Sequence, residues 1–364
     1  MIMRIALVHP KFGSFGGAER YAMSLAQGLC GCGHDVHLFG RKFKNVSNKI
    51  PFHRVPTLKL GRGVKTWSFA RISSLLVNQH DFDIIQGFGK TLGQNVHRTG
   101  GGVHRAYLER LGKSKISLYD RIVIRIEDTL FSLPSLKAII CPSQWVVEEL
   151  QQFYPKVSEK LHLIPNGVDT KIFHTENREF DRKKIVNQLG IPVSYKIFLF
   201  VASNFYLKGL DIALEVLAQM PQTALIVAGG DESRPYQSRA GELGVADRLF
   251  FVGQQEKTAP FYRAADVFFH PTRYDPFANV CLEALSCGTP ILTTERNGVA
   301  DLIENRIGGR VVPVSADRAV MVQALQDLCD QGDAQRMAAR KIALQHDRSV
   351  HVSNVIALYQ HVLG

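Results

Sequence analysis

The chain has 364 residues, which is enough for about two domains that each have a core of their own. A composition of 45% apolar and 21% charged residues is typical of a globular protein. Apolar runs stay below the roughly 18 residues that a membrane-spanning helix needs, and the opening MIMRIALVHP has too short an apolar core for a secretory signal. We therefore expect neither a membrane span nor a signal peptide.

The net charge of +11 is unevenly distributed. Residues 1–168 contain 23 Lys and Arg against 11 Asp and Glu, or +12, whereas residues 169–364 contain 21 against 22, or −1. A basic half suits an acidic partner such as nucleic acid, anionic lipid or a phosphorylated glycolipid. The alternative is a basic surface that only keeps the protein soluble. No nucleic-acid-binding motif is recognisable, which disfavours nucleic acid.

The six cysteines do not indicate a metal site. Cys30 and Cys32 flank one glycine, but no second pair stands at the spacing of a zinc site. Reduced thiols in the cytosol are the favoured interpretation.

The chain begins with a strand, a glycine loop and a helix. Arg4 to His9 alternates as a buried strand, and Tyr21 to Cys30 has helical apolar spacing. Between them Gly13, Gly16 and Gly17 permit positive φ and close backbone approach, so the helix amides can point at a diphosphate or a sugar.

A basic, turn-rich region follows the second strand, Val36 to Phe39. It contains RKFKNVSNKI and KLGRGVKTW, with Phe43, Leu58, Leu60 and Trp67 interleaved. Such a mixture can lie on an anionic membrane surface with its apolar groups inserted. Solvated loops over an ordinary helix from Trp67 to Leu76 explain it equally well.

Further strands are predicted at Phe82 to Gln86, Asn95 to Thr99, Ala138 to Ser143 and Leu161 to Pro165. Three glycines, Gly100 to Gly102, stand before His104 and Arg105 and form a loop whose backbone can lie against a ligand. Pro165-Asn-Gly-Val-Asp169 is a turn rich in Asn and Gly that closes this first series.

A second strand-helix series begins at Tyr195. Its strands are predicted at Tyr195 to Ala202, Thr223 to Gly229 and Arg248 to Gly253, and Lys208-Gly209 precedes a helix from Ile212 to Gln219. Short helices are expected at Tyr262 to Asp266 and Gly298 to Asn305.

The stretch from His270 to Thr294 carries two acids around one short helix. A strand ends at His270, a loop follows, and the apolar residues after Asn279 predict a buried helix that stops at Gly288. Asp275 lies in the loop, and Glu283 lies in the apolar helix. An acid buried there is costly without hydrogen-bond donors, and sugar hydroxyls are such donors.

Because strands alternate with helices twice, the sequence predicts an α/β fold of two doubly wound parallel sheets with a cleft between them. Four motifs follow one another along the chain: Gly16-Gly17-Ala-Glu-Arg20, Pro165-Asn-Gly-Val-Asp169, Lys208-Gly209 and the Asp275–Glu283 pair. Together they resemble the family-four retaining glycosyltransferases of GT-B fold, and the lipopolysaccharide-core glucosyltransferases among them.

The resemblance implies a division of labour between two Rossmann-like domains. Residues 1–168 would bind the acceptor, and residues 169–349 would bind a nucleotide sugar. A terminal helix at residues 350–364 would pack back on the first domain.

The resemblance also implies roles for individual residues. Catalytic roles are expected for Lys208 on the donor diphosphate, Asp275 on the donor sugar, and His104 near the reacting sugar, with His97 as second choice. Donor binding is expected from Gly16, Gly17, Asn166, Lys208, Gln255, Phe277, Ala278, Asn279 and Glu283, the last of these on the ribose.

The sequence departs from the family pattern at two places. Asp275 replaces the usual Glu, and Leu207 or a neighbour stands where an Arg is often found. Lys171, Arg273 and Arg296 are candidates to supply the missing cation.

The implied reaction is transfer of a hexose from a nucleotide sugar, expected to be a UDP-sugar, to a hydroxyl of a glycan or glycolipid in lipopolysaccharide or other cell-envelope synthesis. No cofactor and no metal are expected. The protein would be cytoplasmic, with peripheral contact to an anionic membrane as a further expectation. Alternatives are a non-catalytic nucleotide-sugar-binding protein and a GT-B nucleotide-sugar epimerase.

Overall fold

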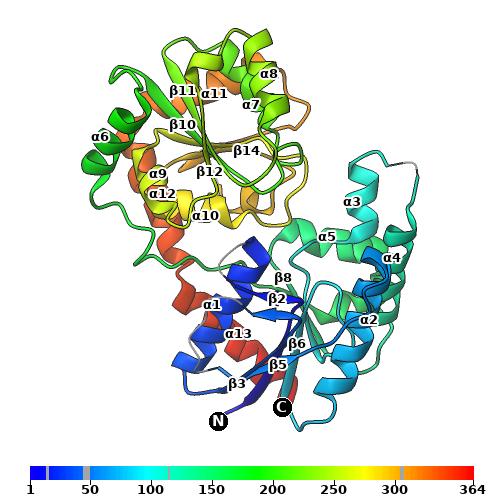
Figure 1. The fold of residues 1–364 in the computed structure, drawn as a ribbon. Coiled ribbons are helices and arrows are strands. Elements are labelled where there is room, and N and C mark those ends of the chain that lie inside the picture. Colours follow the sequence, from blue (N-terminus) through cyan, green and yellow to red (C-terminus); the bar gives the residue numbers. More distant parts are fainter. Residues whose placement is uncertain (14–15, 44–49, 114, 304–306) are drawn as a thin grey trace. The chain divides into compact units, whose positions relative to one another are not determined.

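The computed structural model describes residues 1–13, 16–43, 50–113, 115–303 and 307–364. Within them the chain divides into two compact units, which we call unit 1 (residues 1–166 and 348–364) and unit 2 (residues 167–347). Each unit contains an all-parallel sheet surrounded by helices (Figure 1). Apolar cores lie on both faces of each sheet.

Seven strands form the sheet of unit 1 within the described residues, in the order β5-β3-β1-β6-β7-β8-β9. Their bounds are β1 (Arg4–Val8), β3 (Asp35–Gly40), β5 (Phe52–Arg54), β6 (Ile84–Phe88), β7 (Val96–Arg98), β8 (Ala138–Cys141) and β9 (Leu161–Leu163). The short strands β2 (Lys11–Phe12) and β4 (Lys42–Phe43) pair separately. Parallel pairing brings the carboxyl ends of all seven strands to one edge of the sheet.

Helices cover both faces of this sheet. Their bounds are α1 (Gly17–Gly31), α2 (Gly61–Val77), α3 (His104–Arg110), α4 (Leu118–Phe131), α5 (Gln144–Phe153), the 3₁₀ turn η1 (Pro155–Lys160) and α13 (Arg348–Leu363). Helices α1 and α13 share one core with the strands, whereas α4 and α5 contribute to a core on the other face.

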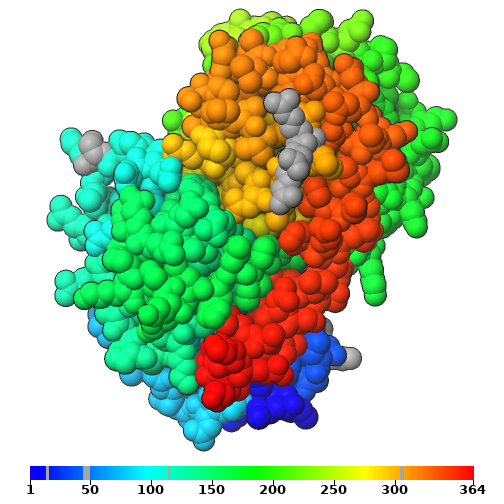
Figure 2. Space-filling view, turned by 180° about the vertical axis from the view of Figure 1, so that it is seen from behind, coloured from blue at the N-terminus to red at the C-terminus, as the bar shows by residue number. Residues whose placement is uncertain are grey.

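Helix α13 belongs to unit 1 although residues 167–347 precede it in the chain. Val355 and Tyr359 are fully buried in the same core as Ile5 and Leu29. The Tyr359 hydroxyl donates to Gln86 at 2.6 Å. In Figure 2 the red residues of α13 lie between the blue start of the chain and the green residues that lead to β9.

Six strands form the sheet of unit 2 within the described residues, in the order β12-β11-β10-β13-β14-β15. Their bounds are β10 (Lys196–Val201), β11 (Thr223–Ala228), β12 (Leu249–Gly253), β13 (Val267–His270), β14 (Ile291–Thr294) and β15 (Gly309–Val312). The central strands are near-continuous apolar runs, such as Ile197 to Phe200, because both faces of a parallel sheet are covered.

The helices of unit 2 also lie on both faces. They are α6 (Arg178–Leu189), α7 (Leu210–Ala218), α8 (Arg234–Glu242), α9 (Ala259–Ala264), α10 (Asn279–Ser286), α11 (Arg318–Asp330) and α12 (Gly332–Gln345), with 3₁₀ turns η2 (Ala246–Arg248) and η3 (Gly298–Leu302). Helices α9 and α10 share a core with α6 and α12, and α7 and α11 share the other.

Two local predictions were wrong in part, and one helix was not predicted. The glycines at 100–102 precede His104, which begins the unpredicted helix α3. The helix expected at Tyr262 to Asp266 is α9 and ends at Ala264. Residues 298–302 form only a 3₁₀ turn, which the Asn297 side chain caps by accepting from the Val299 amide; Asn305 lies outside the described residues.

The described residues include no helix that is both long enough and apolar enough to cross a bilayer.

Candidate active site

The acid and the lysine that the sequence singled out in unit 2 meet at the carboxyl ends of two neighbouring strands. Lys208 follows β10, and Asp275 follows β13. The Lys208 ammonium lies 2.7 Å from an Asp275 carboxylate oxygen and also donates to the Tyr274 carbonyl at 3.0 Å. In open parallel sheets this edge is where ligands bind.

A third side chain, His270, completes this cluster. Its Nε2 lies 3.6 Å from the Asp275 carboxylate, and its ring is fully buried against Phe200 and Phe268. Burial lowers the pKa of His270. Burial alone would raise the pKa of the Asp275 carboxyl, but Lys208 and His270 outweigh it and hold that pKa well below its ordinary range. Asp275 is therefore an anion.

Glu283 lies inside α10 and is nearly buried. The Tyr262 hydroxyl, from α9, donates to its carboxylate at 2.9 Å. The sequence predicted that this acid would need hydrogen-bond donors, but it did not identify Tyr262. A tyrosine 21 residues away gives no local signal, so only the fold shows this partner.

The amides just before α10 are occupied within the chain. The Phe277 amide donates to Asp275 at 3.3 Å, and the Ala278 amide donates to the Asn297 side chain at 3.2 Å. Asn297 also donates to Thr293 at 2.9 Å. These hydrogen bonds fix the loop in front of α10, whose first residue is Asn279.

The cations considered as replacements for the missing arginine differ in their partners. Arg273 donates to both carboxylate oxygens of Asp211, at 2.9 and 2.6 Å, and stacks over the Tyr206 ring. Arg296 lies 3.6 Å from Glu295. Both charges already face an acid of their own, whereas Lys171 is exposed.

Gly209 follows Lys208 and caps α7 with φ +82°. A Cβ at this position would lie 2.1 Å from the carbonyl oxygen of Pro271, so only glycine fits between the two loops. Farther along the same edge, Gln255 follows β12 and donates to the Val252 carbonyl at 2.5 Å.

In unit 1, Gly16 and Gly17 stand at the start of α1. Gly16 is the residue before the helix, with φ +93°, and Gly17 is its first residue. Glu19 in the first turn lies 3.5 Å from Lys11. The loop residues 14–15 lie outside the described residues.

Asn166 is the last residue of the first segment of unit 1 and is buried. Its side-chain oxygen accepts from Arg98 at 2.5 Å. The Arg98 guanidinium lies over the Tyr21 ring, 3.6 Å from its centroid. The Asn of the Pro-Asn-Gly-Val-Asp motif therefore holds an arginine at the end of β7.

The two histidines predicted near the reacting sugar are both buried. The His104 ring lies 2.9 Å from Asp120 of α4, and its amide donates to Glu127 at 3.1 Å. The His97 ring accepts from Gln94 at 3.1 Å, and burial lowers its pKa to about 3. Within unit 1 both rings already have partners, and neither lines the cavity described next.

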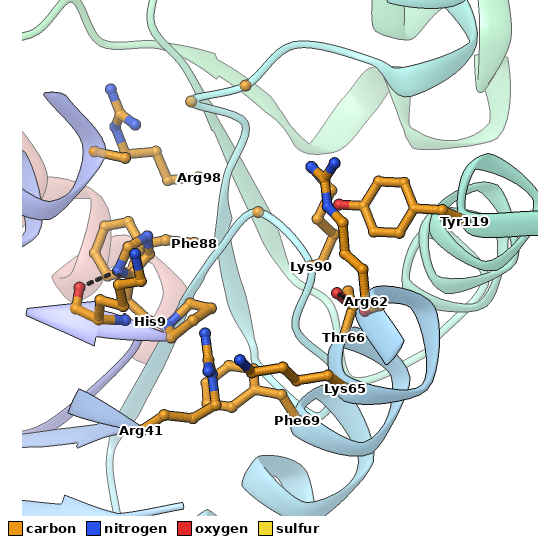
Figure 3. Close-up of a pocket in the computed structure, with 16 residues that line it drawn as sticks. His9, Arg41, Arg62, Lys65, Thr66, Phe69, Phe88, Lys90, Arg98 and Tyr119 are labelled. Atoms are coloured by element: carbon orange, nitrogen blue, oxygen red, sulfur yellow. Dashed lines mark hydrogen bonds between the residues drawn. The ribbon is translucent and has the colours of Figure 1, made fainter. Parts of the chain in front are cut away.

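A cavity of about 480 Å³ lies at the carboxyl ends of β1, β3, β6 and β7 (Figure 3). Its lining contains His9 and Arg98 from strand ends, Arg62 and Lys65 from α2, and Lys90 from the loop after β6. The complete lining is His9, Pro10, Lys11, Ala18, Arg41, Arg62, Lys65, Thr66, Phe69, Phe88, Gly89, Lys90, Arg98, Gly100, Gly101 and Tyr119. The sequence indicated that the first half is basic, but it did not predict that these basic side chains line one cavity.

Two protein families match the sequence. Residues 181–345 match Glycosyl transferases group 1, and residues 15–172 match Glycosyltransferase Family 4. The chain is a glycosyltransferase.

The similarity to known glycosyltransferases extends over most of the chain. Over 323 residues the glycosyltransferase is 26% identical to lipopolysaccharide glucosyltransferase WaaG of Escherichia coli K12, which covers 85% of each chain. The crystal structure of WaaG superposes with a TM-score of 0.85 at 24% identity and covers 98% of this chain and 99% of WaaG. Anabaena HepE in complex with UDP-glucose superposes with a TM-score of 0.77 at 17% identity, with 99% and 100% coverage. The fold is therefore GT-B.

No group of three or more His, Cys, Asp or Glu side chains that could hold a metal ion occurs in the part of the glycosyltransferase that the structure describes. The positive groups at its strand edges are instead Lys208 in unit 2 and the cations of the unit 1 cavity.

Proposed function

We propose that this glycosyltransferase transfers glucose from UDP-glucose to a hydroxyl of a glycan or glycolipid acceptor in lipopolysaccharide synthesis, with retention of the anomeric configuration and without a metal ion. The name of the E. coli relative, a lipopolysaccharide glucosyltransferase, supports the acceptor class. The UDP-glucose complex of HepE supports the donor. The family matches are to transferases and give no support to the epimerase or to a non-catalytic binding protein.

Unit 2 would bind the donor. The observation that supports this proposal is the half-buried Lys208–Asp275 pair at the carboxyl ends of β10 and β13, because the Lys208 ammonium lies 2.7 Å from the carboxylate that would hold the sugar. Glu283, held by Tyr262, would accept from the ribose hydroxyls. Gln255 would lie at the base.

The chemistry needs stabilisation of a leaving diphosphate. As the glycosidic bond breaks, positive charge develops on the sugar ring and negative charge on the phosphate. Lys208 would move part of its hydrogen bonding from Asp275 to the phosphate, and Asp275 would then hold a sugar hydroxyl. The acceptor hydroxyl would attack from the face of the leaving group, and the departing phosphate would take its proton.

Unit 1 would bind the acceptor, and one of its surfaces fits an anionic membrane. Exposed apolar side chains stand before and in α2, at Leu60 (74% exposed) and Trp67 (46%), and others at Ile116 and Leu118 before and at the start of α4. Arg62 of α2 lies over the Tyr119 ring of α4, so the two helix starts are adjacent. Phe43 does not belong to this surface, because its ring stacks on Phe52.

The test is a transfer assay with UDP-glucose and a lipopolysaccharide core that lacks its glucose residues. The parent protein should release UDP only with acceptor present, and UDP-glucose should raise its melting temperature. Lys208→Met should lower kcat/KM roughly 10²- to 10³-fold, because one preorganised donor to the developing charge is lost. Lys196→Met, at the opposite end of β10, is the matched control and should retain activity.

Four results would count against the proposal. Acceptor-independent conversion of the donor would indicate an epimerase, and donor binding without any turnover would indicate a binding protein. Inversion of the anomeric centre, read by NMR of the product, would contradict the proposed same-face attack. Activity lost on dialysis against a chelator and restored by a divalent ion would contradict metal independence.

A further inference from the structure

The cavity of unit 1 collects positive charge, and no acidic side chain of the described residues lines it. Of its six cations only Lys11 forms an ion pair within those residues, with Glu19. The other five are Arg41, Arg62, Lys65, Lys90 and Arg98. Clustered cations repel one another, so a site of this kind is complete only with an anion.

One of these cations is built into the fold. Arg98 is only 4% exposed, its guanidinium stacks on Tyr21 and one end donates to Asn166. Its Nε has no hydrogen-bond partner within the described residues. Gly100 makes room for the other end, because a Cβ there would lie 2.0 Å from Nη1. A buried guanidinium that keeps an unpaired N–H is costly unless a ligand satisfies it.

Among the remaining cations, Arg41 and Lys65 repel each other electrostatically. Lys65 has its pKa lowered, first by the charge of Arg41, although the Lys65 side chain reaches solvent. Figure 3 shows the ends of Arg41 and Lys65 coming together near the Phe69 ring, while Arg62 lies beside Tyr119. The charges therefore gather at more than one place around the cavity.

The cavity also has features suited to a sugar ring. Tyr119, a half-buried residue of the lining, contributes aromatic surface, whereas Phe69 and Phe88 are almost fully buried. Backbone is exposed at Gly89, Gly100 and Gly101. A phosphate monoester carries almost two negative charges at neutral pH. One phosphate would thus balance about two of the five unpaired cations, and a second is needed for most of the rest.

We propose that this cavity binds an acceptor saccharide that carries at least two phosphate groups. The inference rests on the proposed function, in which unit 1 binds the acceptor, and it adds the chemical class of that acceptor. Arg98 and Arg62 would bind phosphate oxygens through planar guanidinium groups, and Lys65 and Lys90 would contribute point charges.

Calorimetry with three soluble probes tests the charge requirement. Glucose 1,6-bisphosphate should bind at least tenfold more tightly than glucose 6-phosphate, and glucose should show no measurable heat. Equal affinity for all three would overturn the inference. Inorganic tripolyphosphate distinguishes a free anion from a phosphorylated sugar: binding as tight as that of the bisphosphate would overturn the saccharide part.

Variants locate the binding. The double variant Lys65→Gln with Lys90→Gln should weaken bisphosphate binding roughly 100-fold, because each charged hydrogen bond is worth about a factor of ten or more. The matched control Lys156→Gln with Lys160→Gln removes the same charge from η1, away from the cavity, and should change the affinity less than threefold. An equal loss in both doubles would show only a general charge effect and would overturn the assignment.

Donor binding keeps the two proposals apart. UDP-glucose should still raise the melting temperature of the Lys65→Gln, Lys90→Gln protein. If it does while the bisphosphate sugar fails to bind the parent, the phosphate inference fails and the proposed function stands. If UDP displaces the bisphosphate sugar competitively, the cavity binds donor phosphates and the acceptor assignment is overturned.

Discussion

At the residue scale, the surroundings of Asp275 explain how this acid can stand in place of a glutamate. Asp275 replaces the Glu expected from the family pattern, and its carboxylate lies against both Lys208 and His270. Because Arg273 is held by Asp211, Lys208 is the cation of this edge that stands next to the proposed sugar acid. The reaction would depend on one lysine where the family pattern often has an arginine as well.

Glu127 offers a pH-dependent prediction. It is buried and accepts from the His104 amide, and burial raises its pKa to about 7. An acid whose folded-state pKa is raised contributes stability that is complete below about pH 4.3, its unfolded pKa, and that is lost as pH rises through about 7. Glu127→Gln should remove this loss, which is on the order of 3–4 kcal/mol.

Urea unfolding at pH 5 and pH 8 measures the effect. Relative to the parent, the Glu127→Gln protein should gain stability between the two pH values, since a Gln oxygen still accepts from the His104 amide. Glu148→Gln, an exposed change on α5, should follow the parent at both. Parallel pH profiles for parent and Glu127→Gln would show that this carboxyl is ionised at pH 5.

The residues found from the sequence were those with a local motif. Lys208, Asp275 and Glu283 stand in short patterns that resemble those of the glycosyltransferase family, and this resemblance pointed to them. Their partners carry no such pattern: His270 ends β13 five residues before Asp275, and Tyr262 comes from α9, 21 residues before Glu283. Contacts of this kind depend on how the elements pack in the fold, so they cannot be predicted from a single sequence.

At the element scale, the turn into α7 depends on a single glycine. Gly209 has φ +82° and lies against the Pro271 carbonyl, whereas Gly190 at the end of α6 has φ +68° and no atom within 4 Å of an added Cβ. Gly190→Ala should cost only the left-handed strain of about 1–2 kcal/mol. Gly209→Ala should cost roughly 1–3 kcal/mol more, because the two loops must separate.

The two alanine variants form a matched pair for urea denaturation, and the transfer assay adds a second readout. Gly209→Ala should also lower activity, since Lys208 is its neighbour, while Gly190→Ala should not. Equal losses of stability would mean that the loops shift without cost and that backbone strain alone explains both.

Strands were predicted from the sequence more accurately than helices. Buried parallel strands such as β10 and β13 are continuous apolar runs, and the sequence predicted them within a residue or two. Helix α6, residues Arg178–Leu189, is mostly polar and was not predicted, because its four apolar residues do not form a clear stripe. Helix α3 was not predicted either, and it has only seven residues, His104–Arg110.

At the scale of the whole molecule, charge separates the units. Unit 1 contains 24 Lys and Arg against 11 Asp and Glu, or +13, and unit 2 contains 20 against 22, or −2. A surface of this sign next to exposed apolar groups predicts binding to anionic vesicles that weakens with salt.

Vesicle sedimentation measures this binding. The parent should sediment with phosphatidylglycerol vesicles at 0.05 M salt and be released at about 0.5 M, where screening is nearly complete. Leu60→Ser with Trp67→Ser should weaken the partition at least tenfold, because two apolar side chains no longer insert. Phe180→Ser with Val193→Ser removes two exposed apolar side chains from unit 2 and should have no effect. Binding unchanged by the first pair would place any membrane contact elsewhere.

The return of α13 to the first sheet has a consequence for biosynthesis. Residues 1–166 leave the ribosome first, yet the core beneath Leu29 and Ile5 stays open until residues 348–364 have emerged. Unit 2 is continuous and can close its own cores beforehand. The nascent chain therefore exposes apolar surface of unit 1 throughout most of translation. A stop codon before Val352 would release a protein in which unit 2 is folded and unit 1 lacks the helix that covers this core.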